Sequence, residues 1–132
     1  MILLAFDVGR KKTGIAIGNT ETGTARPLAV TRGGRERQAE DIAKHIHEWQ
    51  PKQLIVGLPT HMDGREHRMT RFCQVFADML KQRFSLPVSL VDERLSTITA
   101  RAVGGGVNAD SVSAAIVLQD WLCQQTRTKN AA

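Results

Sequence analysis

The sequence predicts an α/β fold, a five-stranded mixed sheet flanked by helices. Two observations lead to it. Early in the chain, short apolar runs follow one another across glycine-bearing turns, a pattern typical of antiparallel strands in a meander. Further along, apolar runs alternate with stretches of helical spacing, an order that requires parallel strands joined by right-handed crossovers. The length of 132 residues suits one domain spanning residues 1–132.

The first three strands are expected close together in the chain. Residues 2–8 form a short apolar run bounded by Gly9, which is typical of a buried strand. A turn through the two lysines leads to a returning strand over 14–18. Gly23 and Pro27 then break the pattern before a third strand, expected around 28–31.

Helical spacing begins after these strands. Apolar residues recur every three or four positions over 35–50, where Pro51 ends the helix. The remaining elements are expected in order as a strand over 53–57, a loop over 58–65, a helical stripe over 69–84, a strand over 87–91, a short helix over 96–102 and a helix over 110–124. The last residues, about 126–132, are expected to be a flexible tail.

Composition narrows the class of protein. Lys and Arg number 18 against 13 Asp and Glu, for a formal charge of +5, which suits a polyanionic partner and equally suits simple solubility. The two cysteines lie far apart without metal-site spacing, so a zinc site is not expected. The N-terminal segment lacks the form of a signal peptide, and no apolar run reaches the ~20 residues of a membrane span. We therefore expect a cytoplasmic protein with no membrane contact.

Asp7 is the first candidate for chemistry. It stands near the end of an apolar strand that is expected to be central, where a carboxylate is costly unless a metal, a cation or hydrogen bonds compensate it. Open α/β sheets place their sites outside such strand ends. The alternative is structural, because Asp also caps turns by accepting backbone N–H bonds.

Two further acidic positions complete the pattern. Asp92 and Glu93 directly follow the fifth expected strand, and Asp110 opens the last expected helix, where Asp is also a favoured N-cap. Three acids from separate elements would suit Mg²⁺, which prefers oxygen ligands. Hydrolysis of a phosphodiester by water is served by two such ions ~3.5–4 Å apart, and Asp7 is the acid expected to bridge them.

Cationic residues surround the same expected edge of the sheet. The loop after the fourth strand leads into Arg65 and Arg68, and Lys11 and Arg94 lie next to the acids in sequence. These side chains would contact backbone phosphates. The alternative for the loop is a solvated turn that leads into a helix.

Four motifs, FDVGRKKTGIAIG, IVGLPTHMDG, VDERLST and ADSVSAAIVLQDWL, together resemble the YqgF/RuvX family of pre-16S rRNA nucleases. They occur in the family's order and cover most of the chain. The resemblance implies an RNase H-like fold related to RuvC-type Holliday junction resolvases, and a Mg²⁺- or Mn²⁺-dependent role in maturing the 5′ end of 16S rRNA, with ribosomal particles as further partners. One departure stands out, since 103–109 is shorter than the corresponding family segment and carries no lysine.

The family motifs assign roles to single residues. Asp7 corresponds to the metal ligand of the first strand, the pair Asp92 and Glu93 to the DER motif, and Asp110 to the acid of the final helix. Glu93 is favoured within the pair because its longer side chain can reach toward Asp7 if the first and fifth strands are not adjacent. Asp92 is the alternative ligand. The resemblance thus implies Asp7, Glu93 and Asp110 as catalytic metal ligands.

Several alternatives remain at this point. A resolvase acting on branched DNA would need the same acids, and no residue in the sequence indicates recognition of a ribose 2′-hydroxyl. The sugar-kinase, actin and chaperone ATPase group shares the DxGxxxxG hairpin, but it needs two such domains, and 132 residues supply one. A non-catalytic RNA-binding factor of ribosome assembly is the third alternative.

Overall fold

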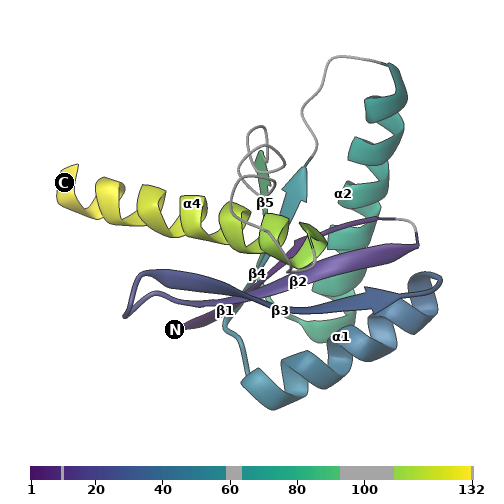
Figure 1. The fold of residues 1–132 in the computed structure, drawn as a ribbon, viewed down its shortest axis with the longest axis horizontal. Coiled ribbons are helices and arrows are strands. Elements are labelled where there is room, and N and C mark those ends of the chain that lie inside the picture. Colours follow the sequence, from purple (N-terminus) through teal and green to yellow (C-terminus); the bar gives the residue numbers. More distant parts are fainter. Residues whose placement is uncertain (10, 59–63, 93–108, 132) are drawn as a thin grey trace.

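The computed structural model describes residues 1–9, 11–58, 64–92 and 109–131, and within these ranges it leaves aside the side chains of 64–69, 92, 109–110 and 124–131. The described elements follow one another as three strands, a helix, a strand, a helix, a strand and a helix. Figure 1 shows them as a sheet with helix α4 on one side and helices α1 and α2 on the other. The short helix expected over 96–102 lies outside the described residues.

The first three strands form the expected antiparallel meander. Strand β1 (Ile2–Asp7) pairs with β2 (Lys12–Asn19), which pairs in turn with β3 (Thr24–Arg32). Both β2 and β3 are longer than the sequence predicts. Pro27 was expected to precede the third strand, yet it lies within β3, because β3 is an edge strand and its pairing with β2 is irregular at this point.

Parallel strands extend the sheet on the other side of β1. Helix α1 (Arg35–Trp49) leads to β4 (Gln53–Leu58), and helix α2 (Gly64–Phe84) leads to β5 (Val88–Asp92). The strand order is β3-β2-β1-β4-β5, with β4 parallel to both β1 and β5. The prediction of a five-stranded mixed sheet is confirmed, and β1 is its central strand. Helix α2 begins at Gly64, so the predicted loop after β4 is too long at its end.

Helix α4 (Ala109–Ala131) crosses the other face of the sheet. It is longer than the predicted helix over 110–124 and extends through residues 126–131, and the flexible tail over about 126–132 stays a prediction. No glycine or proline interrupts this stretch, and Gln, Arg, Lys and Ala are good helix formers. None of the described helices is long and apolar enough to cross a membrane.

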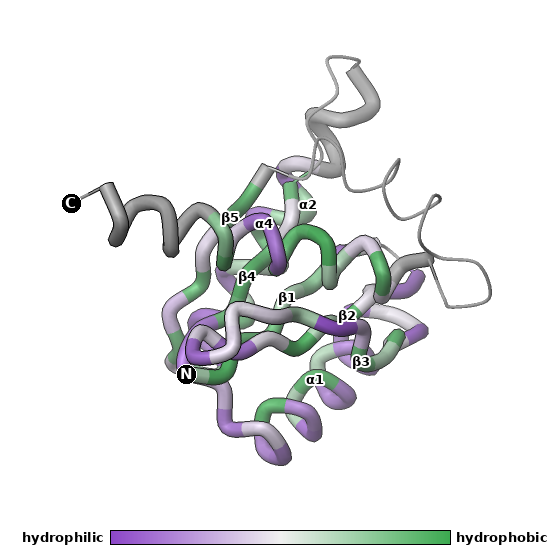
Figure 2. Tube along the Cα trace, turned by 60° about the vertical axis from the view of Figure 1, so that its left-hand side comes forward, coloured by the Kyte–Doolittle hydropathy of each residue, from purple (hydrophilic) through white to green (hydrophobic). Residues whose placement is uncertain are grey.

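Two apolar layers hold the sheet between its helices, and Figure 2 shows β4 as hydrophobic while α1 alternates between hydrophobic and hydrophilic residues. The layer under α1 and α2 contains large side chains such as Phe6, Phe76 and Leu80. The layer under α4 mixes leucine and isoleucine with four alanines. A Cβ at Gly18 would lie 2.8 Å from Leu118 Cδ2, so glycine at this position lets α4 approach the sheet closely. The buried residues of the α4 layer are Leu3, Ala5, Ala16, Ile55, Ala114, Ala115, Val117, Leu118 and Leu122.

Candidate metal and nucleic-acid site

Asp7 is the last residue of the central strand. It pairs with Gly14 of β2 and is half-buried. Strand residues alternate between faces, and Leu3 and Ala5 pack in the layer under α4, so Asp7 belongs to the α4 side of the sheet. The carboxylate therefore stands at the edge where parallel strands end, on the side covered by the last helix.

The DER pair stands at the end of the edge strand β5. Asp92 is the last residue of β5 and is in register with Leu58 of β4. Because β4 lies between β1 and β5, the backbones at Asp7 and Asp92 are two strand spacings apart, about 10 Å. The condition under which the longer Glu93 was favoured, that strands one and five are not adjacent, is confirmed. Glu93 and Arg94 themselves lie outside the described residues.

Asp110 stands in the first turn of α4, as the sequence predicts for the last acid. Its side chain, like that of Asp92, is not among those described. Among the described residues, no three His, Cys, Asp or Glu side chains gather into a possible metal site. Since Asp7 is the only predicted ligand inside that set, the predicted cluster of acids stays a prediction.

The structure describes the backbone of three predicted phosphate contacts, one in the turn after β1 and two at the start of α2. Lys11 is exposed in the turn between β1 and β2. Arg65 and Arg68 lie in the first two turns of α2, which directly follows β4 in the chain, whereas the sequence predicted Arg65 in a loop. Their three-residue separation gives them neighbouring positions on the helix surface.

A buried hydrogen-bond network joins the turn after Asp7 to helix α1, and the sequence analysis missed it. Thr13 Oγ1 donates to Gln38 Oε1 at 2.6 Å, and Gly9 N donates to Thr13 Oγ1 at 3.4 Å. Gln38 Nε2 donates to the carbonyl oxygens of Gly33, at 2.9 Å, and of Gly9, at 3.5 Å. One signal was present in the sequence, because Gln38 precedes Ile42 by four residues and so occupies the apolar face of α1.

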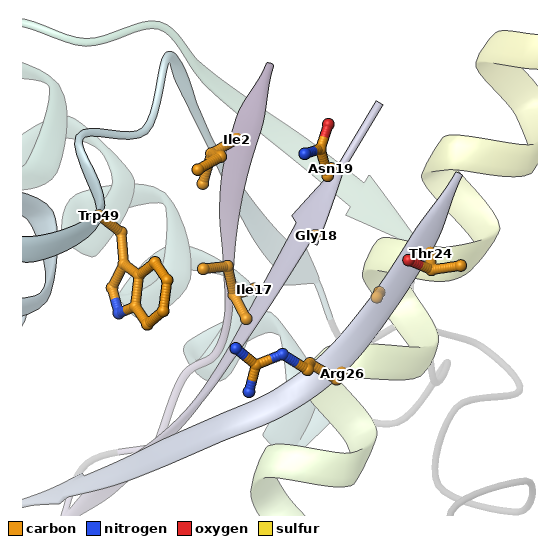
Figure 3. Close-up of a pocket in the computed structure, with 8 residues that line it drawn as sticks. Ile2, Ile17, Gly18, Asn19, Thr24, Arg26 and Trp49 are labelled. Atoms are coloured by element: carbon orange, nitrogen blue, oxygen red, sulfur yellow. The ribbon is translucent and has the colours of Figure 1, made fainter. Parts of the chain in front are cut away.

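A hollow of about 440 Å³ opens at the opposite end of the sheet, where β1 begins. Figure 3 shows Arg26 beside Trp49, and the guanidinium carbon lies 5.8 Å from the ring centroid. None of the described residues that line this hollow is an acid, and Asp7 is not among them. Its lining residues are Ile2, Ile17, Gly18, Asn19, Thr24, Ala25, Arg26 and Trp49.

Two resolvases are among the solved structures that share this fold. The Thermus thermophilus RuvC in complex with a Holliday junction substrate matches with a TM-score of 0.65 and 14% identity, covering 96% of both chains. The fowlpox virus resolvase in complex with Holliday junction DNA matches with a TM-score of 0.57 and 10% identity, covering 95% of this chain and 99% of that one. At such identities the likeness shows the fold alone, which is RNase H-like as predicted.

Sequence comparisons identify the family. Two curated proteins named as candidate pre-16S rRNA nucleases, from Paraburkholderia xenovorans (strain LB400) and Burkholderia mallei (strain SAVP1), are each 44% identical to the chain over 126 and 129 residues. Each alignment covers 91% of this chain and 86% of the relative. The model of the family described as "RuvX: Holliday junction resolvase" matches residues 1–124. The chain therefore belongs to the RuvX family.

Proposed function

We propose that the chain is a metal-dependent nuclease that hydrolyses phosphodiester bonds, and that its substrate is the precursor of 16S rRNA, matured at the 5′ end. The observation that carries the proposal is Asp7, a half-buried carboxylate at the end of the central strand in a chain of the RuvX family. Such a position is costly for an acid that serves only as a polar surface group. The names of the 44% identical relatives support the RNA substrate.

The proposed metal ligands are Asp7, Glu93 and Asp110. Carboxylate oxygens are the donors that Mg²⁺ prefers, and Mn²⁺ accepts the same donors, so the residues fit either ion. Within the DER pair, strand alternation supports Glu93. Val91 packs in the layer under α4, and a strand that continued to Glu93 would place this residue on the same side of the sheet as Asp7. Asp92 is the alternative ligand.

The packing of α4 supports Asp110 as the third ligand. Leu118 lies against Gly18, which pairs with Leu3 near the start of β1. From Leu118 back to Asp110 the helix extends about 12 Å at 1.5 Å per residue. From Leu3 to Asp7 the strand extends about 13 Å at 3.3 Å per residue. A helix that runs back along β1 would therefore begin level with Asp7.

The chain's own residues divide the work of hydrolysis. A divalent ion bound there would supply charge stabilisation for the attacking and leaving oxygens. Asp7, Glu93 and Asp110 would hold such an ion through their carboxylate oxygens, and pairing with Gly14 fixes the backbone of Asp7 against β2. The four proposed phosphate contacts, Lys11, Arg65, Arg68 and Arg94, neutralise the nucleic-acid backbone. We propose that this occurs in the cytoplasm, on free precursor rRNA or on ribosomal particles.

A second substrate, the four-way DNA junction, is favoured by the description of the family. The carboxylates act on phosphate oxygens that RNA and DNA share, so they do not select the sugar. Recognition of the 2′-hydroxyl separates the two substrates. Both substrates therefore belong in the same assay.

The test is single-turnover cleavage of a labelled precursor rRNA fragment and a four-way junction, with Mg²⁺, Mn²⁺ or EDTA. We expect cleavage only with metal, and losses of several orders of magnitude in Asp7→Asn and Asp110→Asn, although an N-cap alone would tolerate Asn. Glu93→Gln should be severe and Asp92→Asn milder. Asp120→Asn, which changes an exposed acid of the same helix, is the matched control and should retain the wild-type rate.

Circular dichroism of each variant confirms the fold. Full activity of Asp7→Asn would eliminate the metal-nuclease mechanism. Full activity of Asp110→Asn alone would leave a site of two acids and return Asp110 to a capping role. A wild-type protein that binds precursor rRNA without cutting it would instead identify a non-catalytic assembly factor.

A further inference from the structure

The side chain of Gln38 is buried in α1 with only 1% of its surface exposed. Both the oxygen and the nitrogen of its amide form hydrogen bonds. The oxygen accepts from the hydroxyl of Thr13, which is fully buried in β2, and the nitrogen donates to the carbonyl oxygen of Gly33. A buried amide requires such partners, because a group that loses its hydration must regain its hydrogen bonds.

The network ends on the turn that follows Asp7. Gly9, two residues after Asp7, donates its N–H to Thr13 Oγ1, and its carbonyl oxygen is 3.5 Å from Gln38 Nε2. Gly33 N donates to the carbonyl oxygen of Lys11 at 2.8 Å. Both ends of the turn, at Gly9 and Lys11, are thereby attached to one side chain of α1 and to the corner that precedes that helix.

We propose that Gln38 is a positioning residue, which holds the turn between β1 and β2 so that the Asp7 carboxylate and the Lys11 ammonium keep a fixed relation to the metal and the substrate phosphate. The inference rests on the proposed function of Asp7. The physical reason is that rates of reaction fall steeply when reacting groups shift by about 1 Å. A turn of this length has no regular pairing of its own, so its shape depends on the groups to which it is bonded.

The most conservative test changes Thr13. Thr13→Val keeps the shape of a β-branched side chain but removes the hydroxyl that Gly9 and Gln38 share, whereas Thr13→Ser keeps the hydroxyl. Gln38→Leu removes the amide itself, and combined with Thr13→Val it removes both side chains of the Thr13–Gln38 hydrogen bond, although the backbone groups of Gly9 and Gly33 also lose their side-chain partners. Thr13→Val alone keeps the bond from Gln38 to Gly33, so it keeps the test valid if the double variant folds poorly.

Gln119 supplies a matched control at the other end of the sheet. Its amide oxygen accepts from Ala25 N at 3.1 Å, and its nitrogen donates to the carbonyl oxygen of Gly23 at 2.7 Å. It is therefore another helical glutamine that attaches a turn between two strands to a helix, far from Asp7. Gln119→Leu should destabilise the protein by a comparable mechanism and leave the catalytic edge unaltered.

The readouts separate positioning from mere stability. For Thr13→Val and the double variant we expect a single-turnover rate at saturating Mn²⁺ that is roughly 10- to 100-fold lower, with a much smaller change in the dissociation constant for the nucleic acid. The rise in melting temperature on adding Mn²⁺ should shrink in these variants. Amide hydrogen exchange at Gly9 should accelerate roughly tenfold. Thr13→Ser and Gln119→Leu should stay close to wild type in all of these measurements.

Two failures are distinguishable. If wild type and Asp7→Asn respond equally to Mn²⁺ and neither cleaves, the proposed function fails before any network variant is measured. If wild type responds to Mn²⁺ and cleaves, but Thr13→Val and the double variant behave like Gln119→Leu, the inference about Gln38 alone is overturned.

Discussion

Replacing Gly9 with alanine disturbs the same turn by steric contact rather than by loss of a hydrogen bond. A Cβ at this position would lie 2.4 Å from the carbonyl oxygen of Lys12. Carbon and carbonyl oxygen normally approach to about 3.3 Å, so the contact is about 0.9 Å too short. The obstacle is backbone, and Lys12 is the first residue of β2, paired with Arg32, so it cannot rotate away as a flexible side chain would. The turn itself must open by about 1 Å.

The magnitude follows from that displacement. A shift of about 1 Å next to the reacting groups lowers a rate by about 100-fold, and overpacking of this kind costs ~1–3 kcal/mol of folding free energy. The assay is single-turnover cleavage with saturating Mn²⁺, together with urea unfolding of the same samples. Gly34→Ala is the control, because nothing lies within 4 Å of its Cβ and its φ of −74° suits any residue. A Gly9→Ala protein that cleaves at the wild-type rate would refute the argument that the shape of this turn controls the chemistry.

Three more predictions follow from other parts of the molecule. Divalent ions should raise the melting temperature of wild type and raise that of Asp7→Asn much less, because a ligand stabilises the state that binds it. Equal shifts in a thermal melt would mean that Asp7 is not a metal ligand. Changing Arg65 and Arg68 to Ala should reduce the slope of log affinity for nucleic acid against log salt concentration, whereas Arg26→Ala, at the other end of the sheet, should not. The slope is measured by filter binding or fluorescence anisotropy. An unchanged slope would mean that nucleic acid binds to another face of the protein. Gly18→Ala should lower the free energy of unfolding by ~1–3 kcal/mol because its Cβ meets Leu118, and Leu118→Ala should lower it by ~2–5 kcal/mol. The double variant should lose less than the sum of the two, because it removes the contact between them. Additive losses in urea unfolding would mean that this contact is not the cause.

Much of the fold was predictable because local patterns determine it. Apolar runs bounded by glycine gave the strands, and helical spacing up to Pro51 gave α1 with an error of about one residue. The length of β3 was not predictable, because Pro27 usually ends a strand and is tolerated here by an edge position that only the assembled sheet defines. The end of α4 was also predicted too early, since polar composition was interpreted as a tail although it favours a helix equally well.

The candidate site was also predictable only in part. Asp7 was predictable from one local feature, an acid at the end of an apolar strand, and the structure confirms its position at the end of the central strand. The network around Gln38 was not predictable, because it joins a turn, a strand and a helix whose residues are 4 to 29 positions apart in the chain. The need for glycine at position 9 comes from the close approach of the Lys12 carbonyl oxygen and not from a positive φ, and this contact too is defined only by the folded turn. The ligand roles of Glu93 and Asp110 stay predictions.

The position of α4 in the chain has a consequence for synthesis. Strand β1 is made first and becomes the centre of the sheet, yet among the described elements it is α4, the last of them, that covers its residues Leu3 and Ala5. A growing chain that has completed β5 therefore exposes one apolar face of its sheet until about twenty more residues of helix have been added, and such faces favour aggregation. Helix α4 packs on β1, so this face of the native sheet is covered only when synthesis of α4 is nearly finished. Premature termination within α4 should yield an aggregating product rather than a smaller folded one.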